Sequence, residues 1–276
     1  MWLKSIILSS SLLASTTIYA ETIFVSLEKD NAIAVVDPIA GKLIKTVAIG
    51  QRPRGIELSP DEQTLYIATS DDDTVITVDA NSLQVTGKLP AGEDPETFAI
   101  NPTGTHMYVS NEDDNQVTVI DLKTAKAIAT VAVGVEPEGI AVSPDGRWIV
   151  SASETTNMLH WIDANTNQIV KNTLVDPRPR ALSFTADGQQ LWVTSEIDGT
   201  VMILDVASKE ITQRTGFQIG GVGAEKIQPV GVIIDSQRRW AYVALGPANR
   251  VAVINAQTYD VEKYLLVGAR VWNLAF

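Results

Sequence analysis

The chain of 276 residues contains no cysteine. Without cysteine it has no disulfide, no thiol nucleophile, no thiolate ligand for an iron–sulfur cluster and no C-x-x-C-H motif for covalent haem. Histidine is almost as scarce, since His106 and His160 are the only two. This scarcity argues against a histidine-based metal site and against a Ser-His-Asp triad. We therefore expect no metal site and no covalently bound cofactor.

Basic side chains are in the minority, with 21 lysines and arginines against 33 aspartates and glutamates. An acidic chain is repelled by the phosphates of nucleic acids and by anionic membranes, so we expect no broad nucleic-acid binding, although local basic sites remain open. Long apolar runs are also missing: a membrane span needs about 20 predominantly apolar residues, and no run in the chain is that long. We therefore expect no membrane span after removal of the signal-like first 20 residues.

The first 20 residues, MWLKSIILSSSLLASTTIYA, are typical of a secretory signal peptide. Lys4 supplies a positive start, Ile6 to Ala14 form a short apolar run, and small or polar residues lead to Tyr19-Ala20. The alternative is a membrane anchor, for which the run is too short. We expect Glu21 to begin the mature protein and residues 21–276 to form one domain.

Three residue series repeat along this domain with a constant spacing of 42 residues, followed by one longer step. The first series consists of Asp37, Asp79, Asp121, Asp163, Asp205 and Asn255. The aromatic or apolar series consists of Phe24, Tyr66, Tyr108, Val150, Trp192 and Tyr242, and the proline series of Pro53, Pro95, Pro137, Pro179 and Pro229. A period of this length with strand-like content is typical of a β-propeller, in which each repeat is one blade.

The third repeat, residues 93–134, shows how one blade is built. TFAI, HMYVS, QVTVID and IATVAVG read as four antiparallel strands, separated by turns rich in Asn, Pro, Gly and Asp. The repeated Asp closes the third strand, where its carboxylate can accept hydrogen bonds from backbone N–H groups of the next turn, so we interpret the Asp series as structural. Complete blades are expected at residues 51–92, 93–134, 135–176, 177–228 and 229–268.

The two ends of the domain contain partial repeats. Residues 21–50 supply only a second, third and fourth strand, and the last segment, ARVWNLAF (269–276), aligns with QRPRGIEL as a first strand. We expect the two to share one blade, which would close a ring of six blades and leave no open sheet edge. The sequence leaves open whether such a ring is natural or is a seven-blade protein cut short.

The repeat, P-x-G-I-x-x-S-P-D-G followed by L-Y-V, V-x-V-I-D and T-V-x-V-G, resembles the YVTN-type β-propeller repeat. The stretches GVGAEKIQPVGV and AYVALGPANRVAVINAQTYDVEKYLLVGARVWNLAF are similar to the periplasmic β-propeller proteins associated with PQQ-dependent catabolism. That resemblance implies a seven-repeat, non-catalytic periplasmic protein. It would act alongside quinoprotein alcohol oxidation and an ABC-type transport system, and an association with PQQ is implied by the resemblance alone.

A candidate site lies where the loop before each first strand opens beside the central channel. We call the position of the repeated proline in each blade the proline slot. The residues directly before and after this slot vary in charge, and they include Arg52, Arg54, Glu96, Glu138, Arg178, Arg180, Arg270 and Trp272. One interpretation is a site for a small anion such as the tricarboxylate PQQ, because arginine binds carboxylates bidentately. The alternative is a rim in which these arginines pair with neighbouring acids.

Three further features have two interpretations each. Trp272 could stack on a planar ligand or plug the channel. The Gly-rich insertion FQIGGVGAEKIQ (217–228), with Lys226, could add contacts to the same face or be a tolerated surface loop. The acidic runs 71–73 and 112–114 could bind Ca²⁺, but they lack the ligand spacing of an EF-hand, so we interpret them as solvated loops.

Taken together, these features favour a non-catalytic binding or scaffold protein of the periplasm, with a protein partner or a small anion at the channel face. A lactonase-like hydrolase is the first alternative, with Glu96 or Glu138 as general base. A single-stranded nucleic-acid binder is the second, against which the net charge counts.

Overall fold

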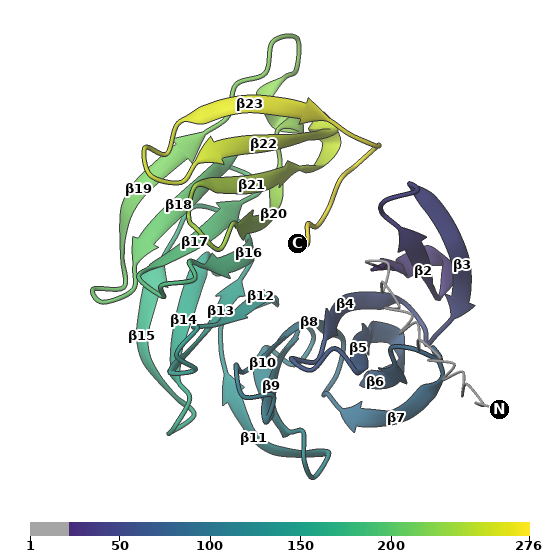
Figure 1. The fold of residues 1–276 in the computed structure, drawn as a ribbon. Coiled ribbons are helices and arrows are strands. Elements are labelled where there is room, and N and C mark those ends of the chain that lie inside the picture. The colour runs from purple at the N-terminus through teal and green to yellow at the C-terminus, as the bar shows by residue number, and fades with distance from the viewer. Residues whose placement is uncertain (1–21) are drawn as a thin grey trace, which may run out of the picture.

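The computed structural model describes residues 22–276, so the predicted signal peptide lies outside the described residues. The described chain forms six antiparallel sheets arranged around a central space (Figure 1). Five sheets have four strands and one has three. The predicted all-β propeller with six blades is therefore confirmed. None of the described helices is long and apolar enough to cross a membrane.

The blades follow one another in chain order. The first blade contains β1 (Ile23–Leu27), β2 (Ala32–Asp37) and β3 (Lys42–Ala48). The second and third contain β4 (Pro53–Leu58), β5 (Thr64–Thr69), β6 (Thr74–Asp79), β7 (Val85–Pro90), β8 (Pro95–Ile100), β9 (His106–Asn111), β10 (Gln116–Asp121) and β11 (Lys126–Ala132). The fourth and fifth contain β12 (Pro137–Val142), β13 (Trp148–Ser153), β14 (Met158–Asp163), β15 (Gln168–Leu174), β16 (Pro179–Phe184), β17 (Gln190–Ser195), β18 (Thr200–Asp205) and β19 (Glu210–Gly216). The sixth contains β20 (Pro229–Ile234), β21 (Trp240–Leu245), β22 (Arg250–Asn255) and β23 (Val261–Leu266). Four 3-10 turns connect strands: η1 (Glu28–Asp30), η2 (Ser70–Asp72), η3 (Ala224–Lys226) and η4 (Gly246–Ala248).

The repeated Asp or Asn holds the turn between the third and fourth strands of each blade. The carboxylate of Asp121 accepts the backbone N–H of Thr124 at 2.7 Å and its hydroxyl at 2.9 Å. Backbone N–H groups also donate to the side chains at the corresponding positions, namely Asp37, Asp79, Asp163, Asp205 and Asn255. One acceptor thus satisfies N–H groups that the sheet leaves unpaired.

The hydrophobic core lies between blades rather than inside one. In one cluster the fully buried Trp161 of the fourth blade packs with Leu191 and Met202 of the fifth, and Phe184 meets the Trp161 ring edge-on at 6.4 Å. In the next cluster Trp192 of the fifth blade packs with Val232 and Val243 of the sixth. Because each sheet is apolar on both faces, every blade needs a neighbour on both sides.

The first strands crowd together around the channel. A Cβ atom on Gly55 would lie 3.1 Å from the carbonyl oxygen of Glu96 in the next blade, and one on Gly139 would collide with the carbonyl oxygen of Arg180. The residue two places after the slot proline is therefore glycine where neighbouring backbones meet this closely. This crowding brings the residue just after each proline close to its counterpart in the next blade.

The C-terminal segment 269–276 takes the position of a first strand, but it does not complete the first blade. The N–H of Gly231 donates to the carbonyl of Trp272 at 2.9 Å, and a Cβ on Gly231 would lie 2.8 Å from the same oxygen. Phe276 packs edge-on against Tyr242 at 5.9 Å. The prediction that the two ends share one blade is therefore wrong, because the segment stays on the sixth blade while β1 pairs only with β2.

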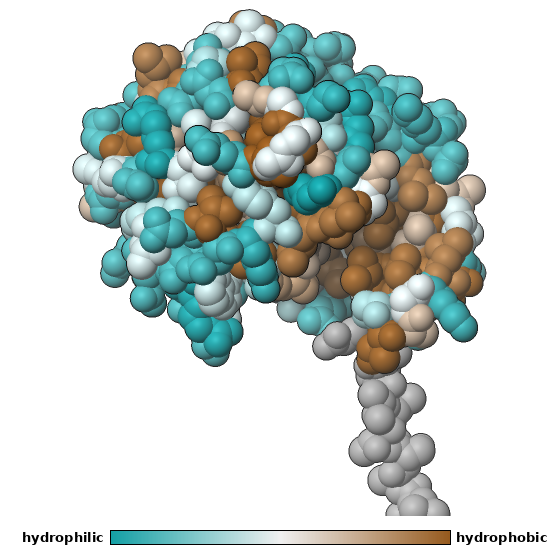
Figure 2. All heavy atoms as spheres, turned by 90° about the horizontal axis from the view of Figure 1, so that it is seen from above, coloured by the Kyte–Doolittle hydropathy of each residue, from teal (hydrophilic) through white to brown (hydrophobic). Residues whose placement is uncertain are grey.

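The ring consequently stays open between the sixth blade and the first (Figure 1). Ile23 and Val25 of β1 are 44% and 41% exposed, and their counterparts Leu65 and Ile67 in the second blade are 1% and 0% exposed. In the remaining blades the corresponding residues are also buried: Met107, Val109, Ile149, Ser151, Leu191, Val193, Ala241 and Val243. Figure 2 shows apolar residues gathered around a hollow beside the point where the described chain begins. The first blade thus presents to solvent the face that every other blade buries.

Replacing Ile23 and Val25 together with lysine should reduce self-association, because charges on an open sheet face oppose pairing with another chain. We expect the free energy of unfolding to change by less than about 1 kcal/mol, since both side chains are already exposed. Analytical ultracentrifugation and urea unfolding would measure the two effects. The matched control, lysine at Leu65 and Ile67, should prevent folding. If the Ile23/Val25 variant also unfolded, the ring would be closed in solution.

Candidate binding face at the channel mouth

Two kinds of loop meet on one face of the propeller. Strands alternate in direction, so the loop that leads into each first strand lies at the same end as the loop between the second and third strands. Arg52 and Arg178, each before a slot proline, have left-handed backbones with φ of 50° and 60°. Their N–H groups donate to Asn31 at 2.9 Å and Asn157 at 3.0 Å, two asparagines of the preceding blade. A side chain from one blade therefore fixes the loop that carries the next blade's charged residues.

The same bridge recurs at Asp94, Glu136 and Arg270, whose N–H groups donate to Asp73, Asn115 and Asn249. The accepting residues, Asn31, Asp73, Asn115, Asn157 and Asn249, form a further repeated series, which was not predicted although its spacing is as regular as that of the aspartates. The fifth blade has Gly199 in the bridging position and cannot make the contact. There the insertion 217–228 follows instead, and it buries Phe217 and Ile227 between the fifth and sixth blades.

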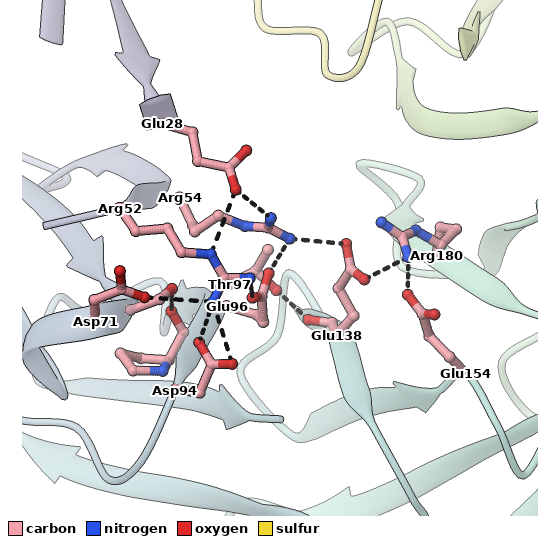
Figure 3. Close-up of polar contacts among 12 residues, drawn as sticks. Glu28, Arg52, Arg54, Asp71, Asp94, Glu96, Thr97, Glu138, Glu154 and Arg180 are labelled. Carbon is pink, nitrogen blue, oxygen red and sulfur yellow. Dashed lines mark hydrogen bonds and ion pairs between the residues drawn. The ribbon is translucent and has the colours of Figure 1, made fainter. Parts of the chain in front are cut away.

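Arg52 and Arg54 of the second blade form the first half of a charge network (Figure 3). Arg52 contacts Asp94 at 3.1 Å, Glu96 at 3.1 Å and Glu28 at 3.4 Å. Arg54 contacts Glu28 at 3.1 Å and pairs closely with Glu96, whose side chain is fully buried. Each guanidinium thus joins carboxylates from the first blade and the third.

Arg178 and Arg180 of the fifth blade form the second half. Arg178 contacts Glu154 at 2.7 Å and Glu196 at 3.2 Å through its Nε atom. Arg180 is only 7% exposed, and it contacts Glu138 at 2.7 Å, Glu196 at 3.6 Å and, most closely, Glu154. Buried charges are tolerated only when they are paired, which this arrangement provides.

Glu138 connects the two halves across the channel mouth. Its carboxylate lies 2.7 Å from Nη1 of Arg180 and 3.7 Å from Nη2 of Arg54. The side chains of Arg54, Glu96, Glu138 and Arg180 therefore follow one another around the channel, each from the second residue of a first strand (Figure 3). In all, seven carboxyl groups contact the four guanidinium groups: Glu28, Asp71, Asp94, Glu96, Glu138, Glu154 and Glu196.

Burial shifts the protonation of the two central carboxyls. It raises the pKa of Glu96 to about 8, against the opposing effect of the Arg54 guanidinium. Burial, together with the neighbouring Glu154 carboxyl, holds the pKa of Glu138 well above its ordinary value. Burial alone would also raise the pKa of Glu154, but the hydrogen bond with Glu138 and the charges of Arg180 and Arg178 lower it. Of this coupled pair, Glu138 therefore holds a proton more readily than Glu154 does.

The structure brings together most of the predicted site residues, namely Arg52, Arg54, Glu96, Glu138, Arg178 and Arg180. Trp272 lies beside them, with the Arg180 guanidinium 4.9 Å and the Arg270 guanidinium 5.7 Å from its ring centre. Arg270 has no acidic partner within the described residues. Lys226 is exposed on η3, and among residues 22–276 it forms no ion pair with the acids of the mouth. The insertion therefore adds its apolar residues to the core and no charge contact to this face.

The glutamates that complete the network, Glu28, Glu154 and Glu196, were not predicted. Together with Glu112 they are spaced by multiples of 42 residues, each directly after a second strand. That spacing was the available signal, but it was hidden by interpreting the loops as solvated. A loop residue repeated in register occupies the same place in each blade, because the blade fixes the position of the loop.

One group of acids has the spacing that a metal ion needs. Oxygen atoms of Asp94, Glu96 and Glu112 lie within 4.8 Å of one another. Arg52, however, already contacts both Asp94 and Glu96 and supplies the positive charge there. Asp94 and Glu96 are thus paired with a guanidinium of the protein, and a metal ion from solution would have to displace it.

Removing Arg180 should destabilise the protein far more than removing Arg178. Arg180→Met leaves Glu138 and Glu154 buried without their partner, so we expect a loss of about 3–5 kcal/mol in the free energy of unfolding. Arg178→Met removes a side chain that is 46% exposed, and the loss should stay below about 1 kcal/mol. Urea unfolding of both variants measures the difference, and equal losses would contradict the buried network.

Stability should also respond to pH through Glu96. Because its pKa is raised from 4.5 to about 8, the folded state holds this proton more tightly than the unfolded chain does. Its contribution is complete below about pH 4.5 and is lost as the pH rises through 8, by at most about 1.4 kcal/mol per pH unit. The Glu96→Gln variant should show a flatter profile in urea unfolding between pH 5 and 9. Glu93→Gln, on the exposed loop before Pro95, is the matched control, and parallel profiles for wild type and Glu96→Gln would refute the assignment.

Comparisons with known proteins agree with this architecture. A family model described as a YNCE-like β-propeller matches residues 64–215. Among solved structures, a chain of the Kuenenia stuttgartiensis hydrazine synthase aligns with a TM-score of 0.83 and 19% sequence identity, over 91% of this chain and 85% of that chain. At this identity the likeness shows a shared fold. No curated protein matches the chain. Because the family model covers more than half of the sequence, the chain belongs to the YNCE-like β-propeller family.

Proposed function

We propose that this chain is a non-catalytic binding or scaffold protein that receives a protein partner at the channel mouth. The observation that carries the proposal is the network around Arg52, Arg54, Arg178 and Arg180, in which side chains from five blades hold one another in fixed positions. A preorganised set of charges loses little freedom on binding, which favours recognition of a partner.

The state of the arginines favours a protein partner over a small anion. Each of the four guanidinium groups already contacts at least two carboxyl groups, so a carboxylate ligand would have to displace an acid from each. We therefore favour a protein partner over a free tricarboxylate such as PQQ. Its more exposed members, Glu28, Asp71 and Arg178, are 45–60% exposed and offer both signs of charge to a partner.

The cellular setting is proposed from the resemblance of the sequence to PQQ-associated propellers. On that basis the protein is periplasmic and serves PQQ-dependent alcohol oxidation and its transport system as an accessory, through a protein–protein contact. The signal-like segment 1–20 supports export. An acid-rich mouth suits a partner whose docking surface carries lysine or arginine.

A hydrolase is the second candidate, and one observation favours it. Burial raises the pKa of Glu96 to about 8 and also raises the pKa of Glu138, and a carboxyl with a raised pKa suits a general acid or base. Both groups, however, are held by arginines, and within residues 22–276 neither faces a nucleophile in hydrogen-bond reach. A binding role is consistent with these contacts, because it does not require Glu96 or Glu138 to exchange a proton with a substrate.

Site-specific photo-crosslinking in the native periplasm tests the proposal. A photoreactive amino acid at position 178 should capture one defined protein, whereas the same residue at position 189, exposed on the opposite face, should not. Reversing the exposed charge with Glu28→Lys should abolish capture without unfolding the chain.

Purified protein then separates the alternatives. We expect PQQ not to raise the thermal midpoint, and we expect no lactone turnover. A PQQ-dependent rise that disappears in Arg178→Met would favour the small-anion site instead, and turnover lost in Glu138→Gln would favour the hydrolase.

A further inference from the structure

A second charged site lies on the opposite face of the propeller, in a cleft of about 520 Å³ between the fourth and fifth blades. Its walls come from three turns: the one before β13 with Arg147 and Trp148, the one before β17 with Gly188 and Gln189, and the one after β18, which leads to Lys209. These turns join first to second and third to fourth strands, so they lie at the end away from the channel mouth.

The cleft gathers cations around one aromatic ring. The ammonium of Lys209 lies 3.9 Å from the centre of the Trp148 ring and 5.3 Å from that of Trp161. The guanidinium of Arg147 lies 4.5 Å from the same Trp148 ring. Both cations therefore use the electron-rich face of an indole in place of an acidic partner.

Neither cation has an ion-pair partner. Among residues 22–276 no carboxylate lies within ion-pairing distance of Arg147 or Lys209, in contrast to the four paired arginines of the mouth. Asp145 attracts Arg147 and Asp205 attracts Lys209 only from beyond that distance. Asp205 lines the cleft, but its carboxylate accepts the N–H and the hydroxyl of Ser208, each at 2.8 Å.

The two cations also repel each other. Burial, followed by the charges of Arg147 and Lys171, lowers the pKa of Lys209. Lys171 is itself paired with Glu210 and donates to the carbonyl of Ser208 at 3.1 Å. In a protein of net charge −12, two neighbouring positive charges without an ion-pair partner form a place where a bound anion would relieve the repulsion.

We propose that this cleft binds a small oxyanion, a carboxylate or a phosphate, between Arg147 and Lys209. Arg147 offers a planar fork of N–H donors, and Lys209 offers a point charge from the facing turn. Trp148 forms the wall between them and can pack against the carbon skeleton of the ligand. The site is independent of the proposed function, because it shares no residue with the channel mouth.

Isothermal titration with citrate and with inorganic phosphate, at low and matched ionic strength, tests the site. We expect saturable binding with one site per chain, and at least a tenfold weaker Kd in Arg147→Gln and in Lys209→Met. Lys126→Met, an exposed lysine at the start of β11, directly after the corresponding turn of the third blade, is the matched control and should bind as wild type does. Arg178→Met at the mouth should also leave binding unchanged, which separates this site from the proposed function.

Fluorescence gives a second readout that does not depend on heat. Trp148 is one of six tryptophans, and an anion that draws Lys209 from its ring should change the emission. The change should vanish in Trp148→Phe, with circular dichroism confirming that the variant folds. Binding that is absent at millimolar citrate and phosphate, or equally weakened in Lys126→Met, would overturn the proposal.

Discussion

Apolar contact between consecutive blades is the interaction on which the rest of this structure depends. Each sheet is apolar on both faces, so Trp161, Trp192 and the side chains around them are buried only because a second blade covers them. The first strands approach so closely that glycine is required at Gly139. Backbone positions around the channel are thereby fixed, and this packing sets the positions of the charged residues at the channel mouth.

The same dependence explains the open side of the ring. A blade without a neighbour exposes its apolar face, and Ile23 and Val25 show this by comparison with Leu65 and Ile67. The C-terminal segment covers part of the sixth blade through Trp272 and Phe276, but it reaches no strand of the first. The faces of the first and sixth blades beside this opening are surfaces with which another chain could associate.

The two ends of the propeller differ in how their cationic side chains are paired. At the channel mouth, carboxyl groups outnumber guanidinium groups, and Arg52, Arg54, Arg178 and Arg180 are each paired. At the opposite end, Arg147 and Lys209 rest on Trp148 without an acid. Both arrangements use positions that vary between repeats, while the positions that set the blade recur. A repeat scaffold can therefore change its sites without changing its core.

The propeller, the strands of each blade and the structural aspartates could be predicted from the amino-acid sequence, because each depends on residues that recur every 42 positions. The sequence also placed Arg54, Glu96, Glu138 and Arg180 on one face. Three features could not be predicted and became visible only in the folded chain. Arg54 and Arg180 meet through Glu138, Glu28, Glu154 and Glu196 complete the network, and the segment after Gly268 stays on the sixth blade. They could not be predicted because a repeat specifies local pairing within a blade. Contacts across the channel and the closure of the ring depend on how all the blades pack together.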